Sequence, residues 1–384
     1  MKSAFIRRLL AAFSLLALLM SAVPADGAGE AKDVAANCVI RLSVNKNART
    51  DLLARSLARY WDGGADGEMT VTLPRDEKAQ GVMLALYDSV TEIVIDSLDA
   101  DAPEEIARYT LPYMNDYIPF SRPAHSFRIR NGDGGRALRI GRINVLTEGT
   151  LPDWVQQWSP PLEGADIQLI ACHPDDEVLW FGGLLPTYAG ELGKKVQVTF
   201  VHTTTPRLDR KNELLDALWH CGVRNYPQLP ESPWTQDVPR YILRAIRKAR
   251  AQVVVTQDVK GEYGSASHIA MVAAVIDAVT GRSADPSADS NSAQAYGTWQ
   301  PKKLYVHLWP ENQSVFDWSR KLPRMGNRSG YKIACEAFRL HMSQQTGKYE
   351  VAMYGARDCR RLGLYFTLVG PDDPDHPDLL QHIE

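Results

Sequence analysis

This chain of 384 residues has few cysteines and few long hydrophobic runs, and charges of neither sign are in large excess. Its five cysteines cannot all pair, and their spacing does not match a zinc-finger framework. In an oxidising compartment, a disulfide between Cys335 and Cys359 is one candidate. Cys172 is expected to be a small buried residue, with a metal-sensitive thiol as the alternative.

The balance of charge restricts the partners. The chain has 43 Lys and Arg against 46 Asp and Glu, a formal net charge of −3. This balance argues against nucleic acid or an anionic membrane as a partner, because both attract basic proteins. No internal repeat is present, and no segment beyond residue 20 has the length and apolarity of a membrane span.

The N-terminal residues have the pattern of an export signal. Lys2, Arg7 and Arg8 precede an apolar run over residues 9–20, and small residues with Pro24 follow. At about 12 residues, the run is short for a membrane span but typical of a cleavable signal peptide. We therefore expect residues 1–25 to be removed and the mature protein to be periplasmic or secreted.

The remaining chain predicts two domains, because about 150 residues is a usual domain length. Over residues 35–147, short apolar segments separated by Asp, Gly and Pro predict a smaller all-β sandwich. These segments are 69–73, 81–87, 91–95, 127–130 and 137–145. Residues 148–164 contain three prolines together with Trp154 and Trp158, so we expect a linker that packs tightly.

Beyond the linker, strand and helix patterns alternate through residues 165–384. Strands are predicted at 167–172, 196–202, 252–256 and 303–307, and helices at 184–192, 210–221, 237–250 and 267–280. This order is typical of βαβ units and predicts an α/β fold with a Rossmann-like parallel sheet and flanking helices. The Ala-, Ser- and Asp-rich segment 283–296 is expected to be an exposed loop.

The most informative polar residues come directly after the first of these strands. His-Pro-Asp-Asp-Glu at 173–177 follows the apolar run, and ligands usually bind beyond the carboxyl ends of parallel strands. The two Asp residues alone could simply cap the next helix. The Gly-rich segment 261–268 follows another predicted strand, however, and brings His268 to the same edge. Two His and one Asp with an open position suit a catalytic divalent metal, zinc or iron.

With these motifs in place, residues 165–384 resemble the PIG-L/LmbE-like N-deacetylase family. The shared features are the His-Pro-Asp-Asp-Glu motif, an Arg-x-x-Glu-Leu helix beginning at Arg210, and the late Gly-rich segment. The resemblance implies a divalent metal, in the first place Zn²⁺, as cofactor. Its implied ligands are His173, Asp176 and His268. The same resemblance implies Asp175 as the general base, and Arg210 and Glu213 as substrate contacts.

Amide hydrolysis asks for these residue types. A bound metal lowers the pKa of its water towards about 7 and polarises the carbonyl. Asp175 would take the proton from this metal-bound water, a step that contributes roughly 10²–10⁴-fold, and could return it to the leaving amine. Adjacent Asp side chains point in different directions, which lets Asp176 bind the metal.

One position departs from the family pattern. The first His of the late motif, which in the family helps to polarise the carbonyl or stabilise the oxyanion, is Ser265 here. Loss of one oxyanion donor typically costs about 10²–10³ in turnover. Tyr263, two residues earlier, is the candidate replacement, and the Ser265 hydroxyl is the weaker candidate. The alternative for Tyr263 is a ring packed in a turn.

Four further polar residues lie near the predicted site. His202 and His307 lie near strand ends and could enter the pocket, but structural histidines are common and both are left outside the metal set. Glu177 is expected to brace the loop or a metal ligand. Asp258 is expected either to support a ligand or to form an Asx turn.

Together these features predict an exported, metal-dependent hydrolase that removes the acetyl group from an N-acetylated amino sugar or glycan. The alternatives are a hydrolase of another acyl amide or ester, and a carbohydrate-binding protein with impaired catalysis. Residues 60–145 resemble a diverged discoidin-type jelly roll, a fold that often binds sugars. A structural domain that shields or shapes the catalytic cleft is the alternative for this region.

Overall fold

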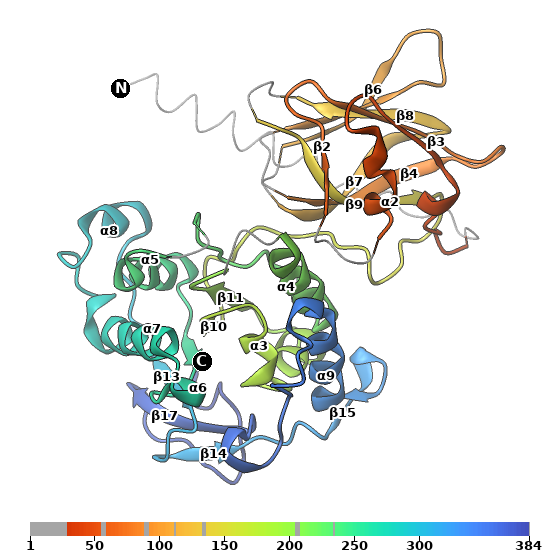
Figure 1. Ribbon diagram of the computed structural model, residues 1–384. Coiled ribbons are helices and arrows are strands. Elements are labelled where there is room, and N and C mark those ends of the chain that lie inside the picture. The colour runs from red at the N-terminus through yellow and green to blue at the C-terminus, as the bar shows by residue number, and fades with distance from the viewer. Residues whose placement is uncertain are drawn as a thin grey trace.

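The computed structural model describes residues 29–54, 59–87, 92–110, 113–132, 136–203, 208–232 and 235–383. The expected signal peptide, residues 1–25, lies outside these ranges. Within them, no helix has both the length and the apolar character needed to span a bilayer. Figure 1 shows a β-rich N-terminal part beside an α/β part.

The N-terminal part is a sandwich of two antiparallel sheets, as predicted. One sheet has the strand order β1-β3-β8-β5-β6 and the other has the order β2-β9-β4-β7. The strands are β1 (Val39–Leu42), β2 (Trp61–Asp62), β3 (Glu68–Thr72), β4 (Ala79–Leu86), β5 (Ile93–Ser97), β6 (Glu104–Tyr109), β7 (Asn115–Ala124), β8 (Ser126–Asn131) and β9 (Arg139–Thr147). Short helical segments precede β2, namely η1 (Ala35–Asn37), η2 (Lys46–Ala48) and α2 (Arg49–Leu52).

Side-chain alternation builds the core of this sandwich. Met69 and Val71 of β3 lie opposite Ile129 and Phe127 of β8, and all four side chains are fully buried. The residues between them are half-buried, as expected for strands with one face on a core. The outer face of β4 is also covered, because Met83 packs with Val155 of the linker.

The C-terminal part is built on a six-stranded sheet with the order β11-β10-β12-β13-β17-β14. Four strands are parallel: β10 (Ile167–Ala171), β11 (Val196–Phe200), β12 (Val253–Thr256) and β13 (Lys303–His307). They confirm the Rossmann-like prediction. The sheet is nevertheless mixed, because β17 (Arg361–Thr367) and β14 (Gln313–Val315) extend it in the antiparallel direction.

Helices cover both faces of this sheet (Figure 1). On one face α5 (Val238–Ala249) and α7 (Ala266–Asp277) pack against Ile170 and Val254. On the other face, α3 (Asp176–Leu179), α4 (Leu208–His220) and α9 (Gly330–Leu340) share a core with Leu169 and Val255. The remaining segments are η3 (Pro186–Glu191), α6 (Gly261–Gly264), η4 (Ala278–Arg282), α8 (Ser290–Tyr296), β15 (Lys321–Leu322), η5 (Pro323–Met325), β16 (Arg328–Ser329), η6 (Met342–Gln344) and η7 (Gly355–Arg357).

The predicted loop over 283–296 is wrong in its second half, where α8 forms. The first three residues of α8 are Ser, Asn and Ser, which favour turns over helix interiors, so the local sequence did not indicate a helix. A buried side chain of α5 organises the segment instead. The Arg247 guanidinium donates hydrogen bonds to the Asp289 carbonyl oxygen (2.8 Å) and to Ser292 Oγ (2.6 Å).

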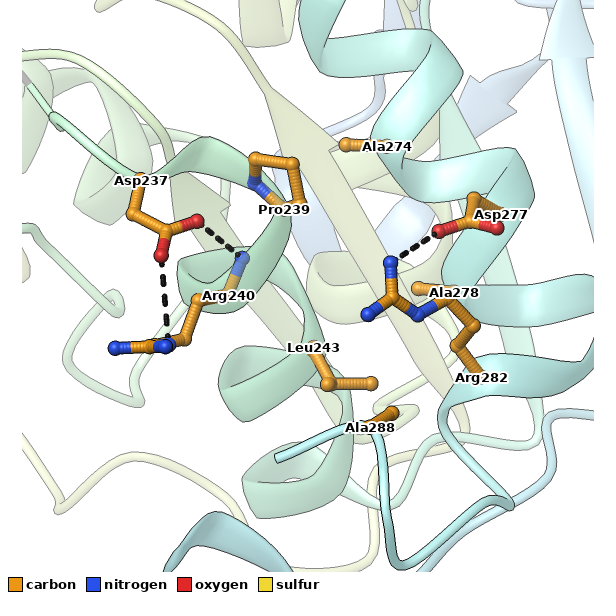
Figure 2. A pocket seen from close by; sticks show the side chains of 9 residues that line it. All are labelled: Asp237, Pro239, Arg240, Leu243, Ala274, Asp277, Ala278, Arg282 and Ala288. Carbon is orange, nitrogen blue, oxygen red and sulfur yellow. Dashed lines mark hydrogen bonds and ion pairs between the residues drawn. The ribbon is translucent and has the colours of Figure 1, made fainter. Parts of the chain in front are cut away.

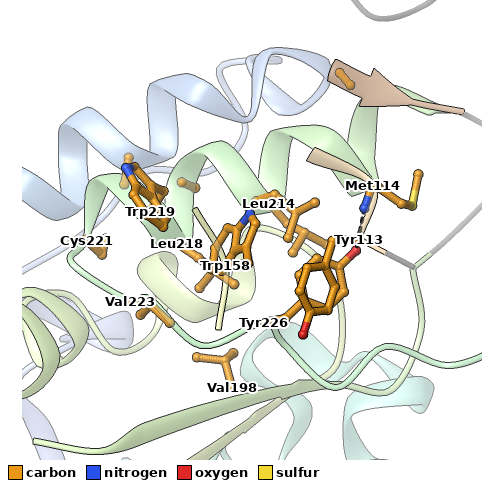
Figure 3. Packing of buried hydrophobic residues seen from close by; sticks show 14 of the residues in the cluster. Tyr113, Met114, Trp158, Val198, Leu214, Leu218, Trp219, Cys221, Val223 and Tyr226 are labelled. Carbon is orange, nitrogen blue, oxygen red and sulfur yellow. Dashed lines mark hydrogen bonds between the residues drawn. The ribbon is translucent and has the colours of Figure 1, made fainter. Parts of the chain in front are cut away.

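Aromatic residues join the two parts of the chain. Figure 3 shows Trp158 of the linker packed among Trp219, Tyr226 and Tyr113. The Tyr113 and Tyr226 ring centroids lie 4.4 Å apart, and those of Trp158 and Trp219 lie 5.2 Å apart. The Tyr226 hydroxyl also accepts a hydrogen bond from the Met114 N–H at 3.2 Å. Each aromatic pair adds about 0.5–1.5 kcal/mol beyond its buried area, so the linker is part of a packed junction.

A carboxylate of α4 adds polar contacts to the same junction. Asp216 accepts hydrogen bonds from Gln156 Nε2 (2.6 Å), Arg142 Nη2 (3.2 Å) and Asn115 Nδ2 (3.4 Å). These donors come from β7, β9 and the linker, so α4 is anchored to the N-terminal part. The same helix carries Arg210 and Glu213, the two predicted substrate contacts.

All five cysteines are free thiols. The candidate disulfide between Cys335 and Cys359 is therefore not formed. Cys172 is fully buried, as expected from its place at the end of β10.

Candidate active site

The site lies where the order of the parallel strands reverses. The chain runs from β10 to its neighbour β11 and then to β12 on the other side of β10. Such a reversal opens a crevice beyond the carboxyl ends of the strands. The loop 173–177 follows β10, Gln257 follows β12, and His268 lies in the first turn of α7. The two predicted motifs therefore meet at this crevice.

Three side-chain atoms converge there. His173 Nδ1 and His268 Nε2 are 3.0 Å apart, and each lies 3.4 Å from Asp176 Oδ2. Ligand atoms about 2.0–2.1 Å from a tetrahedral metal lie about 3.3 Å from one another. The spacing and the donor types therefore fit a single divalent metal ion.

The polar surroundings prepare Asp176 as an anionic ligand. Burial alone would raise its pKa, but the charge of His268 and the contacts with His173 outweigh burial and hold the pKa at about 2. Its Oδ2 accepts the His173 N–H at 2.7 Å, and its Oδ1 accepts the Trp180 indole N–H at 2.6 Å. These bonds fix the carboxylate and leave it charged at neutral pH.

The His268 ring is held from its other side. Gln257 Nε2 lies 2.9 Å from His268 Nδ1, and Gln257 Oε1 accepts the Cys172 N–H at 2.8 Å. Such contacts to the ring nitrogen away from the metal orient a ligating His. The Gln257 amide thus connects the end of β10 to α7.

Cys172 offers a competing ligand atom. Its sulfur and one nitrogen of each His lie within 4.8 Å of one another. The sulfur is 3.8 Å from His173 Nε2, whereas Nδ1 of that ring faces Asp176. Burial raises the pKa of the Cys172 thiol, which is therefore protonated in the metal-free protein, whereas Asp176 is already charged. We therefore favour the Asp176 carboxylate over the thiol as the third ligand.

Asp175 has a strained backbone and a buried carboxyl group. Its φ of 107° is a conformation that residues with a side chain rarely adopt. Glu177 Oε2 accepts the Asp175 N–H at 2.8 Å and holds this geometry. Burial, with the nearby charge of Asp176, raises the Asp175 pKa to about 8. A group with this pKa can exchange a proton near neutral pH.

Glu177 is itself held by a residue far along the chain. His341, at the end of α9, contacts Glu177 Oε1 through Nε2 at 2.6 Å, and both side chains are fully buried. The sequence prediction that Glu177 braces the loop agrees with this contact. Its partner His341 was not among the predicted site residues.

Tyr263 lies next to His268, one of the three predicted metal ligands. Its ring centroid lies 5.3 Å from that of His268, and the residue is 45% exposed. Partial burial raises the phenol pKa, so Tyr263 keeps its proton at neutral pH and can donate a hydrogen bond. Ser265 Oγ lies 3.0 Å from Ser267 Oγ. Both candidate donors are therefore in the loop that ends at His268.

The two predicted substrate contacts lie at α4. Arg210 Nη2 donates to the Pro174 carbonyl oxygen at 2.5 Å and lies 3.4 Å from Asp175 Oδ1. Glu213 accepts hydrogen bonds from the N–H and hydroxyl of Ser343, at 2.8 and 2.6 Å. Arg210 therefore borders Asp175, whereas Glu213 ties α4 to η6. Substrate contact by either residue remains a prediction.

His202 and His307, the other two histidines predicted near the site, lie outside the group of ligand atoms. The His202 ring centroid is 5.8 Å from that of His173, and its Nδ1 accepts the Thr235 N–H. His307 is fully buried between Glu262 and the Asp358 carbonyl oxygen. Glu262 Oε1 also accepts the Asp258 N–H at 2.9 Å. This pair therefore stabilises the turn between β12 and Tyr263, in which Asp258 takes part through its backbone.

Three supporting residues were missed by sequence reasoning: Trp180, Gln257 and His341. Trp180 was accessible to it, because it follows Asp176 by four residues and so lies on the same side of a helical turn. Gln257 and His341 gave no local signal. They reach the site through contacts with residues 85 and 164 positions away.

A separate hollow lies between α5 and α7, away from the metal cluster. Figure 2 shows its polar groups, which pair with one another: Arg240 with Asp237 and Arg282 with Asp277. Its volume is about 220 Å³. Because its charges are already paired and no metal-ligand set lines it, we place the chemistry at the crevice and not here.

Comparison with known proteins agrees with this assignment. The family model PIG-L, described as GlcNAc-PI de-N-acetylase, matches residues 168–279. Two curated relatives are 1D-myo-inositol 2-acetamido-2-deoxy-alpha-D-glucopyranoside deacetylases. The one from Catenulispora acidiphila is 27% identical over 46% of this chain and 65% of the relative. The one from Frankia casuarinae is 29% identical over 39% of this chain and 61% of the relative. The chain thus spans less than two thirds of the length of either.

Two solved structures each match part of the chain. N,N'-diacetylchitobiose deacetylase from Pyrococcus horikoshii matches with a TM-score of 0.38 and 17% identity, over 47% of this chain and 71% of that one. The family 32 CBM from C. perfringens NanJ, in complex with galactose, matches with a TM-score of 0.26 and 13% identity, over 30% of this chain and 97% of that one. The match of the family model, which contains His173, Asp176 and His268, decides the assignment: residues 168–279 form a PIG-L family domain.

Proposed function

We propose that this chain is an exported, zinc-dependent N-deacetylase acting on an N-acetylated amino sugar or glycan. The observation that carries the proposal is the convergence of His173 Nδ1, His268 Nε2 and Asp176 Oδ2 within 3.4 Å of one another. The names of the curated relatives, which are deacetylases of 2-acetamido-2-deoxy-glucopyranosides, support the substrate class.

The residues around the cluster supply the remaining chemistry. A divalent metal held there would activate water and polarise the amide carbonyl. Asp175 takes a proton from the attacking water and delivers it to the leaving amine, a task that suits a pKa of about 8. The protonated Tyr263 phenol donates a hydrogen bond to the carbonyl oxygen as negative charge develops on it.

Zinc and export rest on different observations. The donor set of two imidazoles and one carboxylate is that of catalytic zinc with an open position, although iron uses a similar set. Export rests on the basic and apolar pattern of residues 2–25. Sequencing the N-terminus of the protein recovered from an extracytoplasmic fraction tests export, and a start near residue 26 is the expected result.

Acetate release tests the activity. Purified mature protein, loaded with zinc or other divalent metals, is incubated with N-acetylated mono- and oligosaccharides. We expect release that Asp175→Asn and His268→Ala each lower by at least about 10². The matched control is His376→Gln. It removes an exposed histidine that pairs with Asp373 and takes no part in the site, so turnover should be unchanged. Sugar binding without acetate release would instead favour a carbohydrate-binding protein whose catalysis lapsed with Ser265.

A further inference from the structure

A second group of residues lies next to the predicted metal ligands, and one segment of it, residues 348–357, is outside the range that matches the family. Residues 348–357 bring Tyr349 to Tyr263, with ring centroids 5.2 Å apart. Trp180 lies next to both, at 6.2 Å from each ring. Because the Tyr263 ring is 5.3 Å from that of His268, this aromatic wall begins at the metal site.

Two cations lie over this wall. Arg357 Cζ is 5.8 Å from the Tyr263 ring centroid and 5.5 Å from that of Tyr349. Lys348 Nζ is 6.0 and 5.1 Å from the same two centroids. Cations at these distances are attracted by the aromatic rings, so Lys348 and Arg357 are both held near the same two tyrosines.

Lys348 and Arg357 differ from the nearby arginines, whose side chains are paired with acidic or amide groups of the protein. Arg360, three residues after Arg357, pairs with Asp358 at 2.8 Å, and Arg361 donates to Gln313. Among the residues that the structure describes, no carboxylate lies within ion-pair distance of Lys348 or Arg357. Two adjacent cations without a protein anion, one of them half-buried, can together bind an anionic group of a ligand.

We propose that the substrate is an acidic saccharide, with its carboxylate or phosphate bound by Arg357 and Lys348. The inference rests on the proposed function. The N-acetyl group would lie at the predicted metal ligands, and the sugar ring would pack on the exposed side of Tyr263. Its anionic group would then reach the two cations beside Tyr349, the aromatic ring next to Tyr263. Arg357 offers the planar pair of N–H donors that suits carboxylate and phosphate.

Three sugars test this proposal: N-acetylglucosamine, N-acetylglucosamine 6-phosphate and N-acetylmuramic acid. The first is neutral, the second carries a phosphate and the third a carboxylate, so the two acidic sugars separate the sources of the anion. We expect kcat/KM to be about tenfold or more higher for at least one acidic sugar than for the neutral sugar, since charge-assisted hydrogen bonds are strong. Arg357→Gln and Lys348→Met should each lower this ratio several-fold. Added salt should lower it too.

The control and the opposing outcomes are definite. Arg361→Gln removes a neighbouring cation whose guanidinium is bound to Gln313, and it should leave the ratio unchanged. Equal kcat/KM for all three sugars, or a ratio that both site variants leave intact, overturns the acidic-saccharide proposal while deacetylation itself stands. If no sugar releases acetate, the proposed function fails. Calorimetric binding of the same sugars then decides this inference: it holds if the acidic sugars bind more tightly and Arg357→Gln weakens them, and it is wrong otherwise.

Discussion

At the scale of single residues, the site depends on side chains that hold others in place. Asp175 adopts a φ of 107°, and a strained residue of this kind persists only where its surroundings impose the conformation. Asp176 receives an N–H bond on each of its oxygens, from His173 and Trp180. The motif therefore works as a rigid loop whose two carboxyl groups have opposite pKa shifts: Asp175 is raised and Asp176 is lowered.

The oxyanion donor can be identified by two substitutions. Tyr263→Phe removes one hydroxyl and should lower kcat by about 10²–10³ with a smaller change in KM, because the bond forms mainly as charge develops. Ser265→Ala should have a smaller effect. The measurement is steady-state acetate release for both variants. Unchanged turnover in Tyr263→Phe would remove this residue from the mechanism, and a large loss in Ser265→Ala would transfer the role to the serine.

The Gln257 amide should control the affinity for the metal. Gln257→Leu removes the contact to His268 Nδ1 (2.9 Å) and should weaken zinc binding about 10–100-fold. Gln257→Glu puts a carboxylate oxygen, which can accept from a ring N–H, in place of the amide nitrogen beside His268 Nδ1 and should retain more of the affinity. Competition with a chelator of known affinity gives the dissociation constants. Equal constants for the wild type and Gln257→Leu would show that the amide only fills space.

At the scale of elements, the site is assembled from segments that lie far apart in the sequence. The loop after β10 is held by α9, because His341 contacts the Glu177 carboxylate in the fully buried interior. The turn before α7 is held in a similar way from β13, where His307 contacts Glu262. Each buried His–Glu pair fixes a loop that has a residue with positive φ: Asp175 in the first loop and Glu262 in the second.

Breaking the first of these pairs should destabilise the fold. His341→Leu leaves the Glu177 carboxyl buried without its partner, which costs about 3–5 kcal/mol when one member of such a pair is removed. His341→Gln keeps a donor and should lose less. Urea unfolding of both variants gives the free energies. The account would be contradicted if His341→Leu were as stable as the wild type.

An element could be predicted where its own residues carry the pattern, and could not where tertiary contacts determine it. The strands β10 to β13 were predicted because most of their residues are apolar or β-branched, which is typical of buried parallel strands. β7 was not predicted, since Pro119 and Pro123 interrupt its pattern; it is an edge strand, where proline is tolerated. The convergence of His173 and His268 could be predicted, because each follows a predicted parallel strand and such strands end at the same edge of the sheet. The contacts of Gln257 and His341 depend on tertiary packing, which no local pattern encodes.

At the scale of the whole molecule, the N-terminal sandwich and the α/β part share one packed junction. Trp158 and Tyr226 form its aromatic core (Figure 3). Asp216 joins α4 to both β9 and the linker. α4 also carries Arg210, which contacts Asp175. Disturbance of the junction is therefore expected to reach the site through α4.

The junction should make the stability depend on pH. Asp116 belongs to the junction, because its Oδ1 accepts the Trp158 N–H at 3.1 Å. Burial raises the pKa of Asp116 to about 7, against about 3.9 in an unfolded chain. Between these values the folded state keeps a proton that the unfolded state has lost, so its contribution to stability falls as pH rises from about 4 to 7 and is constant above. Over this window the contribution is at most about 4 kcal/mol.

Asp116→Asn isolates this contribution, because asparagine does not titrate. Urea unfolding at pH 4, 5.5, 7 and 8 should show the difference in unfolding free energy between wild type and variant shifting in favour of the variant up to about pH 7. A difference that is the same at all four pH values would mean that Asp116 has an ordinary pKa in the folded protein.

The measurement that tests the central claim most directly is a titration of the metal-free enzyme with zinc while acetate release from an N-acetylated sugar is followed. The account predicts no turnover after chelation, a rise that saturates at one equivalent of zinc per chain, and no recovery in Asp176→Asn at that ratio. Full turnover in the chelated protein, or recovery of Asp176→Asn equal to the wild type, would contradict it.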